Sequence, residues 1–382
     1  MLFMGNDLNK ESTLIIRLVV AGFLAGMALS YPLWTTFREF PSVPLIGFSP
    51  AVLFPFDVIF ILLLAIGLIW LIIKQNGLIL WITVGLALVV FTADQLRWQP
   101  WAFLYFIMLI ILGLGMQRGR RNPETLNTLR LMLVCVYFYS GIVKINTYFF
   151  AYGVYSFFPW MYAILPGFTH SFLPVLNVFI IIAEILLAAG LVFNTTREKS
   201  AKLLMLMHFG IAFFIVLVNK WNPVIFPWNM VMISLLYILF IRNSEAKPLE
   251  IFWNNGNLSH IVVILLLGVL PALSLVDKWD KYLSSHLYSF TTDNAIVEFD
   301  PDATLPEDVI WQPYVNRTDS TQTLNIFRWS MASLKAPVYP ESRIFRSITD
   351  EICAVAREDI IQIHYGLLHF EKDREEVWLC EE

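Results

Sequence analysis

The sequence predicts an all-α polytopic membrane bundle of about nine transmembrane helices, followed by a small C-terminal extracytoplasmic α+β domain. Of the 382 residues, 58% are hydrophobic and only 15% are charged, and the mean hydropathy is +0.66, outside the range of ordinary soluble domains. The charge changes along the chain: residues 1–277 carry 16 Lys and Arg against 11 Asp and Glu, whereas residues 278–382 carry 10 against 19. We therefore predict a transmembrane domain over residues 1–277 and an α+β domain over residues 278–382.

Nine apolar runs approach the length of about 20 residues that a membrane-spanning helix needs. They are residues 13–33, 51–73, 77–93, 101–117, 128–145, 172–193, 201–219, 224–241 and 259–276. Residues 151–168 are also apolar and aromatic, but Pro159 and Pro166 interrupt them. We interpret this segment as interfacial or re-entrant, since irregular backbone at membrane depth has to be buried in protein. In the first run, Gly22 and Gly26 allow close helix packing, within the bundle rather than in a dimer.

The basic residues predict the orientation of these spans. With the N-terminus inside, the inner segments hold twelve Lys and Arg and the outer loops hold four, which is a clear positive-inside bias. The densest basic cluster, Arg118 to Arg121, falls on the inner side. The first apolar run has no clear cleavage site and is expected to remain as a span. We predict a multi-pass protein of a cell inner membrane, with a cytoplasmic N-terminus and an extracytoplasmic tail.

Alternating apolar residues predict that the acidic tail is folded. Residues 286–290, 295–299 and 309–315 are expected to form strands, and residues 324–334 and 344–356 helices. Residues 360–370 and 376–380 resemble a hairpin across a charged turn.

The composition of the tail also restricts the kinds of partner that the chain is expected to bind. Its acidity argues against nucleic acid and against docking onto anionic lipid, so the expected partners are the bilayer itself and an extracytoplasmic protein. Three cysteines are too few for a disulfide framework. Cys135 is expected to be a buried packing residue, whereas Cys353 and Cys380 could pair if the tail faces an oxidising compartment.

Lys144 is the main candidate for chemistry in the apolar part. It lies in the segment YFYSGIVKINTYFF, residues 137–150, at the point where the apolar run ends and one turn after Ser140 and Gly141. An ammonium group at this depth either snorkels to the headgroups or has a function. Glu184, near the middle of its span, is expected to be protonated or paired, with His208 or with another polar group. A lysine desolvated among apolar residues can act as a base or nucleophile.

Other polar residues gather at the predicted outer ends of the spans, where a pocket roofed by the tail would collect them. Asp94 and Arg97 are interpreted either as an ion pair that closes a tight loop or as catalytic groups. The asparagines between Asn219 and Asn229 could satisfy backbone groups freed by two prolines. Motifs of nucleotide-binding, zinc-peptidase and serine-hydrolase sites are absent from the sequence, and no metal site is predicted.

The segment YFYSGIVKIN resembles the Gly-x-x-Lys-Leu segment of vitamin K-dependent gamma-carboxylases and their bacterial relatives, the horizontally transferred transmembrane (HTTM) family. A later span that begins HFGIAFF at His208 and an outward C-terminal domain add to the resemblance, which covers roughly residues 10–280. In that family the corresponding lysine is held to be the base that meets oxygen and reduced vitamin K, and it falls on Lys144. Val143 stands where a second lysine can occur in the animal enzymes, and the tail is far shorter than the lumenal region of the carboxylases.

The resemblance implies a membrane enzyme that uses a quinol or a similar lipid-soluble cofactor, with Lys144 as general base and Asp94, Arg97 and His208 in support. The residues expected to bind the cofactor are Trp98, Trp101, Asn146, Trp228 and Asn229. A more distant similarity to DoxX-type and MauE-type proteins supports an alternative, a non-catalytic or redox-assisting membrane protein that acts through partners. A transporter is a third hypothesis, for which no internal repeat is seen.

Overall fold

The computed structural model describes residues 10–45, 54–117, 122–214, 222–253, 257–318, 320–367 and 376–380. It divides into two compact units. The helical unit comprises Met1–Gly26, Leu63–Ala87 and Pro100–Phe290, and the sheet unit comprises Met27–Leu62, Leu88–Gln99 and Thr291–Glu382. The sheet unit thus includes two segments that the predicted division at residue 277 assigns to the transmembrane domain. The cluster Arg118 to Arg121 lies outside the described residues.

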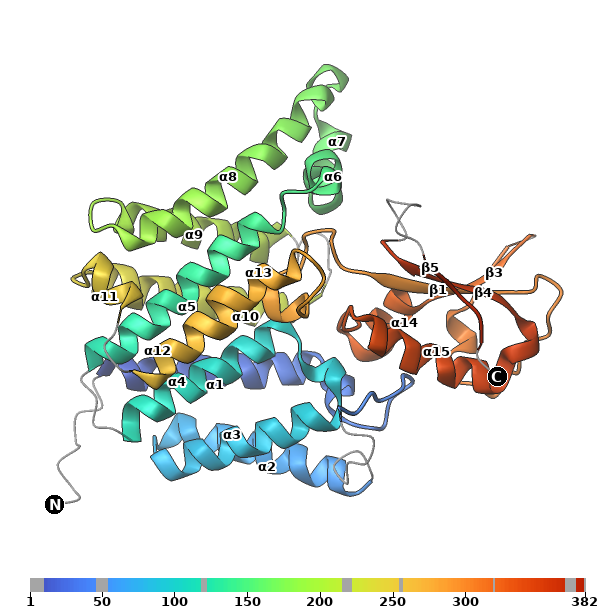
Figure 1. The fold of residues 1–382 in the computed structure, drawn as a ribbon, viewed down its shortest axis with the longest axis horizontal. Coiled ribbons are helices and arrows are strands. Elements are labelled where there is room, and N and C mark those ends of the chain that lie inside the picture. Colours follow the sequence, from blue (N-terminus) through green and yellow to red (C-terminus); the bar gives the residue numbers. More distant parts are fainter. Residues whose placement is uncertain are drawn as a thin grey trace. The chain divides into compact units, whose positions relative to one another are not determined.

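Most of the chain before residue 277 is helical (Figure 1). Its longer helices are α1 (Lys10–Leu29), α2 (Phe56–Ile73), α3 (Gly77–Ala93), α4 (Pro100–Gln117), α5 (Asn122–Ile142), α8 (Leu173–Val192), α9 (Arg197–Ile211) and α10 (Ile225–Leu236). A π-helical turn, η6 (Tyr237–Arg242), follows α10, and α11 (Pro248–Phe252) is short. The last apolar helix consists of α12 (Leu258–Val263), the π-helical η7 (Ile264–Val269) and α13 (Leu270–Ser274).

Six helices in the described part of the chain are long and apolar enough to cross a membrane. They lie at Lys10–Leu29, Phe56–Ile73, Pro100–Gln117, Pro123–Ile142, Gly167–Val192 and Ile225–Arg242. Gly77–Ala93 and Leu258–Ser274 are apolar but shorter. The molecule therefore has the character of a multi-pass helical membrane protein, while the predicted number of nine spans is not confirmed.

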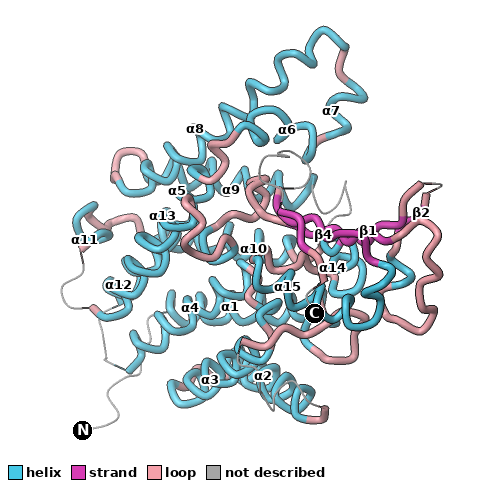
Figure 2. The backbone as a smooth tube through the Cα atoms, turned by 45° about the vertical axis from the view of Figure 1, so that its right-hand side comes forward, coloured by secondary structure: helices cyan, strands magenta, loops and turns pink. Residues whose placement is uncertain are grey.

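Short helices occupy the proline-rich segment before α8, two of which, α6 and α7, are labelled in Figure 2. They are α6 (Thr147–Phe157), α7 (Pro159–Ile164) and the 3-10 helix η4 (Gly167–Phe172). Proline fits the first turn of a helix but cannot continue one, and Pro159 begins α7 while Pro166 precedes η4. The expected break of this segment at its prolines is confirmed.

Glycines in α1 allow close packing inside the helical unit. A Cβ atom at Gly22 would lie 2.5 Å from the Tyr105 hydroxyl, and one at Gly26 would lie 2.5 Å from the Trp101 ring. Real Cβ atoms do not approach so closely, so only glycine lets these aromatic side chains of α4 reach the α1 backbone. The predicted role of the pair in bundle packing is confirmed.

The tail contains a five-stranded antiparallel sheet in the order β2-β3-β1-β4-β5. Its strands are β1 (Asn294–Phe299), β2 (Asn316–Arg317), β3 (Gln322–Asn325), β4 (Ile360–Gly366) and β5 (Glu376–Trp378). Figure 1 shows α14 (Ile326–Leu334) and α15 (Ser342–Ala356) on one side of the sheet. Val297 and Phe299, which alternate with partly exposed residues, are fully buried, as expected for a sheet with one covered face.

Two predicted strands of the tail are wrong. Residues 286–290 form no strand, because Tyr288 and Phe290 adopt positive φ angles of 64° and 63°, which an extended strand cannot contain. Residues 309–315 contain the 3-10 helix η9 (Gln312–Tyr314) instead of a strand. The predicted β1, the two helices and the β4–β5 hairpin are confirmed, whereas β2 and β3 were not predicted.

Cys353 at the end of α15 and Cys380 after β5 form a disulfide with a Cα–Cα distance of 5.7 Å. The tail also binds the short segments that join the first helices. Trp329 Nε1 donates to the Glu39 carbonyl at 2.7 Å, and Gln99 Nε2 donates to the Pro337 carbonyl at 2.8 Å. These contacts explain why residues before position 100 belong to the sheet unit.

Candidate functional site

Lys144 follows α5 in a tight turn and directs its side chain back along the helix. Its Nζ atom donates to Glu184 Oε2 at 2.7 Å and to both the carbonyl and the hydroxyl oxygen of Ser140 at 2.8 Å. Lys144 is 7% exposed and Glu184 is 6% exposed. The interpretation of Lys144 as a snorkelling lysine is therefore wrong, because the ammonium is enclosed and fully provided with acceptors.

Glu184 reaches Lys144 because α5 and α8 approach each other closely at Gly141. A Cβ atom at Gly141 would lie 3.3 Å from the Glu184 Cβ. Ser140 Oγ also donates to Glu184 Oε2 at 3.1 Å, so one serine bridges both charged groups. Of the partners considered for Glu184, the structure selects Lys144. Removing one partner of such a buried pair typically costs about 3–5 kcal/mol, because the other charge stays buried.

His208 belongs to a second set of hydrogen bonds one helical turn from the first. Its Nε2 atom lies 2.7 Å from the Tyr137 hydroxyl, and its Nδ1 atom lies 2.5 Å from Asn229 Oδ1. The Asn229 amide group donates to the Ile225 carbonyl at 2.7 Å. Asn229, expected to bind a cofactor, therefore holds the imidazole ring of His208, and it satisfies a backbone carbonyl as the proline-rich segment led us to expect.

The two sets share one face of α5. Tyr137, Ser140 and Lys144 follow one another at spacings of three and four residues, which place side chains above each other on a helix. Lys144 and Tyr137, the α5 partner of His208, therefore lie on the same face of α5. Tyr137 was not among the predicted site residues, although this spacing alone could have identified it.

Asn146 is the only predicted cofactor-binding residue that the described contacts place beside Lys144. Its Oδ1 accepts from the Phe149 backbone at 2.9 Å and caps α6, while its Nδ2 donates to the Ser289 carbonyl at 2.9 Å. The ring of Phe149 lies 5.9 Å from Lys144 Nζ, within the range of a cation–π contact. Asn146 therefore positions the aromatic wall of the lysine site.

Trp101 and Trp228 belong to a different aromatic cluster of the helical unit. Tyr105 lies between them, with ring centroids 6.1 Å from Trp101 and 5.3 Å from Trp228. Phe23 of α1 completes the cluster. These rings pack α1, α4 and α10 together, which is a packing role rather than a contact with Lys144.

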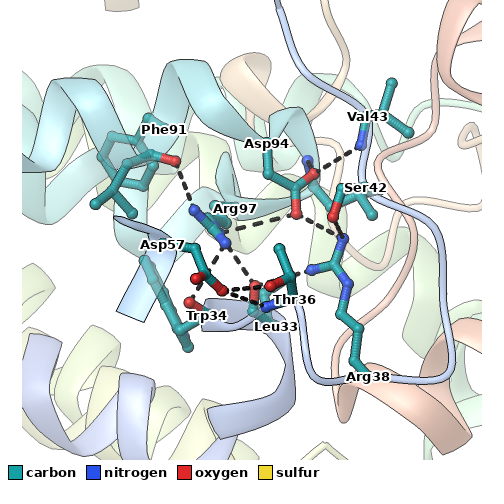
Figure 3. A network of polar contacts seen from close by, with 12 residues as sticks. Leu33, Trp34, Thr36, Arg38, Ser42, Val43, Asp57, Phe91, Asp94 and Arg97 are labelled. Carbon is teal, nitrogen blue, oxygen red and sulfur yellow. Dashed lines mark hydrogen bonds and ion pairs between the residues drawn. The ribbon is translucent and has the colours of Figure 1, made fainter. Parts of the chain in front are cut away.

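Asp94, Arg97 and Trp98 lie in the sheet unit, and Asp94 and Arg97 belong to a polar network of their own (Figure 3). Asp94 pairs with Arg38 at 2.7 Å and more loosely with Arg97 at 3.8 Å. Its other oxygen accepts from the backbone of Val43 and Leu96. Burial lowers the pKa of Arg97 to about 10, although Asp94 opposes this shift.

The side-chain donor groups of Arg97 and Trp98 form hydrogen bonds with backbone carbonyls. Arg97 donates to the carbonyls of Leu33, Val90 and Trp34 at 3.0 to 3.3 Å. The Trp98 indole donates to the Phe91 carbonyl and stacks on the Phe91 ring. Asp57 accepts from both the backbone and the hydroxyl group of Thr36 (Figure 3). These contacts favour the interpretation of Asp94 and Arg97 as an ion pair that closes a tight loop. Arg38, which was not predicted, is the closer ion-pair partner of Asp94.

The described residues contain no group of three His, Cys, Asp or Glu side chains that could hold a metal ion. Asn219, the first of the asparagines near the two prolines, lies outside the described part of the chain. Comparison of the chain with family models, curated proteins and solved structures found no match. Fold and site together define a multi-pass helical membrane protein with a buried lysine–glutamate pair.

Proposed function

We propose that this chain is a membrane enzyme that removes a proton from a lipid-soluble, quinol-like molecule, with Lys144 as the base. The observation that carries the proposal is the 2.7 Å contact between Lys144 Nζ and Glu184 Oε2 inside apolar helices. A surrounding of low dielectric disfavours both charges, so a proton can move from the ammonium to the carboxylate and leave a neutral amine. That amine can accept a proton from a hydroxyl group, while Ser140 holds it in place.

The surroundings of Lys144 fit an aromatic alcohol. Phe149, Phe157 and Phe290 form a cluster with ring centroids 5.8 to 6.4 Å apart, and Tyr288 packs on Phe157 at 5.7 Å. Asn222 donates its amide hydrogen to the Tyr288 hydroxyl, while its own Oδ1 is buried without a hydrogen-bond partner among the described residues. An aromatic wall with one free acceptor is typical of sites that orient a ring carrying a hydroxyl group. A quinol, when bound, would supply an acidic hydroxyl and a redox-active ring.

We further propose that the chain spans a cell inner membrane nine times, with the N-terminus in the cytoplasm and the sheet-bearing tail outside. The distribution of basic residues supports this orientation. The Cys353–Cys380 disulfide adds support, because disulfides persist in oxidising compartments and are rare in the cytoplasm. The apolar helices Gly77–Ala93 and Leu258–Ser274 are the candidates for two further spans. The candidate for the ninth is the predicted run 201–219, which begins within α9 and continues beyond the described residues.

The test uses an alkylated naphthol, a redox-inert analogue of a quinol whose absorption spectrum reports its ionisation. The full-length protein is reconstituted in lipid nanodiscs, and the naphthol is titrated at fixed pH. We expect the bound naphthol to ionise at a lower pH than in empty nanodiscs, because Lys144 accepts its proton. Lys144→Met should abolish this shift.

Lys202 provides the matched control, since it also pairs with a glutamate, Glu198 at 2.6 Å, but its side chain is 62% exposed. Lys202→Met should leave the naphthol spectrum unchanged. Binding is measured separately, by quenching of tryptophan fluorescence. A wild-type protein that binds the naphthol without changing its ionisation contradicts the proposal.

The alternative function, redox assistance through an extracytoplasmic partner, has one observation in its favour. Cys353 and Cys380 are bonded, and Cys380 is partly exposed, whereas Cys353 is buried. Incubation of the protein with a small dithiol at graded potentials measures whether this disulfide exchanges. Rapid exchange while the tail stays folded favours the alternative, and resistance to reduction until the tail unfolds identifies a structural disulfide.

A further inference from the structure

The ammonium group of Lys144 has a complete set of hydrogen-bond acceptors. An ammonium carries three N–H bonds and no lone pair. Three oxygens lie at 2.7 to 2.8 Å from Nζ, namely Glu184 Oε2, the Ser140 carbonyl and the Ser140 hydroxyl. A neutral amine has only two N–H bonds and would leave one of these oxygens without a donor. The contacts therefore match the protonated form of Lys144.

The Ser140 carbonyl is free to accept from Lys144 because α5 ends at this point. The Lys144 backbone N–H donates to the Gly141 carbonyl at 3.2 Å, so the side-chain ammonium supplies the donor that a continuing helix would have given the Ser140 carbonyl. Carbonyl groups at the C-terminus of a helix carry partial negative charge, which favours a cation. The end of α5 thus stabilises the ammonium form over the amine.

The hydroxyl group of Ser140 contacts both charged groups of the site. A serine within a helix commonly donates to the carbonyl four residues earlier, as Ser234 of α10 donates to Met230 at 2.9 Å. Ser140 instead donates across to Glu184 Oε2 at 3.1 Å and accepts from Lys144 Nζ at 2.8 Å. One hydroxyl group therefore stabilises the carboxylate as a donor and the ammonium as an acceptor.

Other ionisable groups surround this site, but none of the described ones forms an ion pair with Lys144 except Glu184. Those on α5 itself are Glu124, Arg130, Cys135, Tyr137 and Tyr139. Those on the elements packed against α5, which include η8 (Tyr282–Ser284), are Tyr105, Glu184, Tyr237, Arg242, Glu250, His260 and Tyr282. Those on the elements packed against α8 are Tyr148, Tyr152, Tyr155, His170, Arg197, Glu198, Lys199, Lys202 and His208.

We infer that Ser140 is a positioning residue that keeps the proton on Lys144 and thereby sets the pH above which the amine becomes available. The inference rests on the proposed function, because it concerns the proton that Lys144 must lose before it can act as a base. Ser140 acts through Lys144 and Glu184, and it neither takes nor gives a proton itself.

The proton transfer within the pair explains why the hydroxyl group matters. An N–H bond breaks at Lys144 Nζ and an O–H bond forms at Glu184 Oε2, so the step needs no further reactant. Both side chains become neutral, and the two hydrogen bonds of the Ser140 hydroxyl lose the charges that strengthen them. Removal of the hydroxyl group therefore destabilises the charged pair more than the neutral pair, and the amine forms more readily.

The test is pH-dependent labelling of Lys144 by a membrane-permeant amine reagent, in the full-length protein in lipid nanodiscs, followed by peptide mass spectrometry. Only the neutral amine reacts, so the pH of half-maximal labelling reports the equilibrium between the two forms. Ser140→Ala should lower this midpoint by about one pH unit, which corresponds to roughly tenfold faster labelling below the midpoint. Ser140→Thr keeps the hydroxyl group and should retain the wild-type midpoint.

A merely structural role of Ser140 predicts a different result. A void left by Ser140→Ala would let the reagent reach Lys144 faster at every pH and would lower the melting temperature, without moving the midpoint. Ser140→Cys is a second variant of similar size, and it should also lower the midpoint because a thiol is a weak donor and acceptor.

Ser234→Ala is the matched control. Ser234 is also a half-buried serine of an apolar helix, and its described hydrogen bond stays within that helix. Ser234→Ala should leave the midpoint unchanged. A wild-type midpoint in Ser140→Ala or Ser140→Cys, or an equal shift in Ser140→Thr or Ser234→Ala, overturns the inference.

The naphthol assay separates this inference from the proposed function. If the naphthol ionises on the wild-type protein but Ser140→Ala labels like wild type, the role of Ser140 is refuted and Lys144 remains the proposed base. If Ser140→Ala lowers the labelling midpoint but the naphthol never ionises, the role of Ser140 stands and the proposed function fails.

Discussion

Gly141 of α5 and Ile185 of α8 are in direct contact, so that a Cβ atom added to Gly141 would lie 2.6 Å from Ile185 Cγ1 and 3.2 Å from the Ile185 backbone nitrogen. A backbone atom cannot move aside as the end of a side chain can. The close approach of these two helices is also what brings Glu184 within reach of Lys144. Packing and the charged pair therefore depend on the same glycine.

We predict that Gly141→Ala destabilises the protein by about 1–3 kcal/mol, the usual cost of overpacking. The measurement is unfolding in detergent, followed by circular dichroism. Gly85→Ala in α3 is the control, because a Cβ at Gly85 meets nothing within 4 Å and alanine favours a helix over glycine by roughly 0.5–1 kcal/mol. Equal stability of the two variants would show that α5 and α8 are not in close contact.

The Lys144–Glu184 pair should behave as a coupled unit. Lys144→Met and Glu184→Gln each leave one buried group without its partner, so each should cost about 3–5 kcal/mol of unfolding free energy. The double variant Lys144→Met with Glu184→Gln should cost less than the sum, by about 0.5–3 kcal/mol. Thermal unfolding of the four proteins in the same detergent gives this coupling energy. Strict additivity would mean that the two side chains do not interact.

The hydrogen bonds of Glu298 lead us to predict that the sheet loses stability in acid. Hydrogen bonds from Gln362 at 2.8 Å and then from His364 at 3.0 Å lower the pKa of Glu298 below its ordinary value of 4.5. Because the pKa is lower in the folded state, this stabilisation is complete above the unfolded pKa and is lost as the pH falls through the folded pKa. The sheet should therefore lose stability on acidification below about pH 4.5, where the carboxylate takes up its proton.

Hydrogen exchange of the β1 and β4 amides, corrected for intrinsic rates, measures this effect. Gln362→Leu should reduce protection at pH 6 and flatten its dependence on pH. Gln312→Leu, in the 3-10 helix η9 and without a described hydrogen bond to Glu298, should keep the wild-type profile. A pH dependence that survives in Gln362→Leu and in His364→Gln would assign the acid sensitivity to another group.

The sequence was sufficient to predict the broad architecture, because the length of an apolar run and the distribution of charge can be read directly from neighbouring residues. The helical segments follow from runs of Leu, Ile, Val and Phe, and the breaks at Pro159 and Pro166 follow from the chemistry of proline. The same alternation of apolar residues that located β1 also suggested a strand at 286–290. There the pattern failed, because left-handed backbone at Tyr288 and Phe290 depends on packing against Phe149 and Phe157, which no local signal reveals.

The candidate site shows the same limit. Lys144, Glu184 and His208 stand out in a sequence because charged or titratable groups are rare in apolar runs. Which of them pair was not determined, since Lys144 and Glu184 are 40 residues apart and meet only through the fit of α8 against Gly141. The pairing of Arg38 with Asp94 is of the same kind. Helical spacing alone, in contrast, places Tyr137 and Lys144 on one face.

The chain carries its own reporters of orientation. Asn316 begins an Asn-Arg-Thr sequence in β2, and Asn194 begins an Asn-Thr-Thr sequence between α8 and α9. Both asparagines are exposed, so both can be glycosylated if they enter the lumen of microsomes. With the proposed orientation, synthesis of the full chain in microsomes should add a glycan at Asn316 and none at Asn194. Asn316→Gln should remove the gel shift, and Asn194→Gln should leave it in place. The reverse pattern would place the tail in the cytoplasm, and glycans at both sites would contradict the predicted number of spans between them.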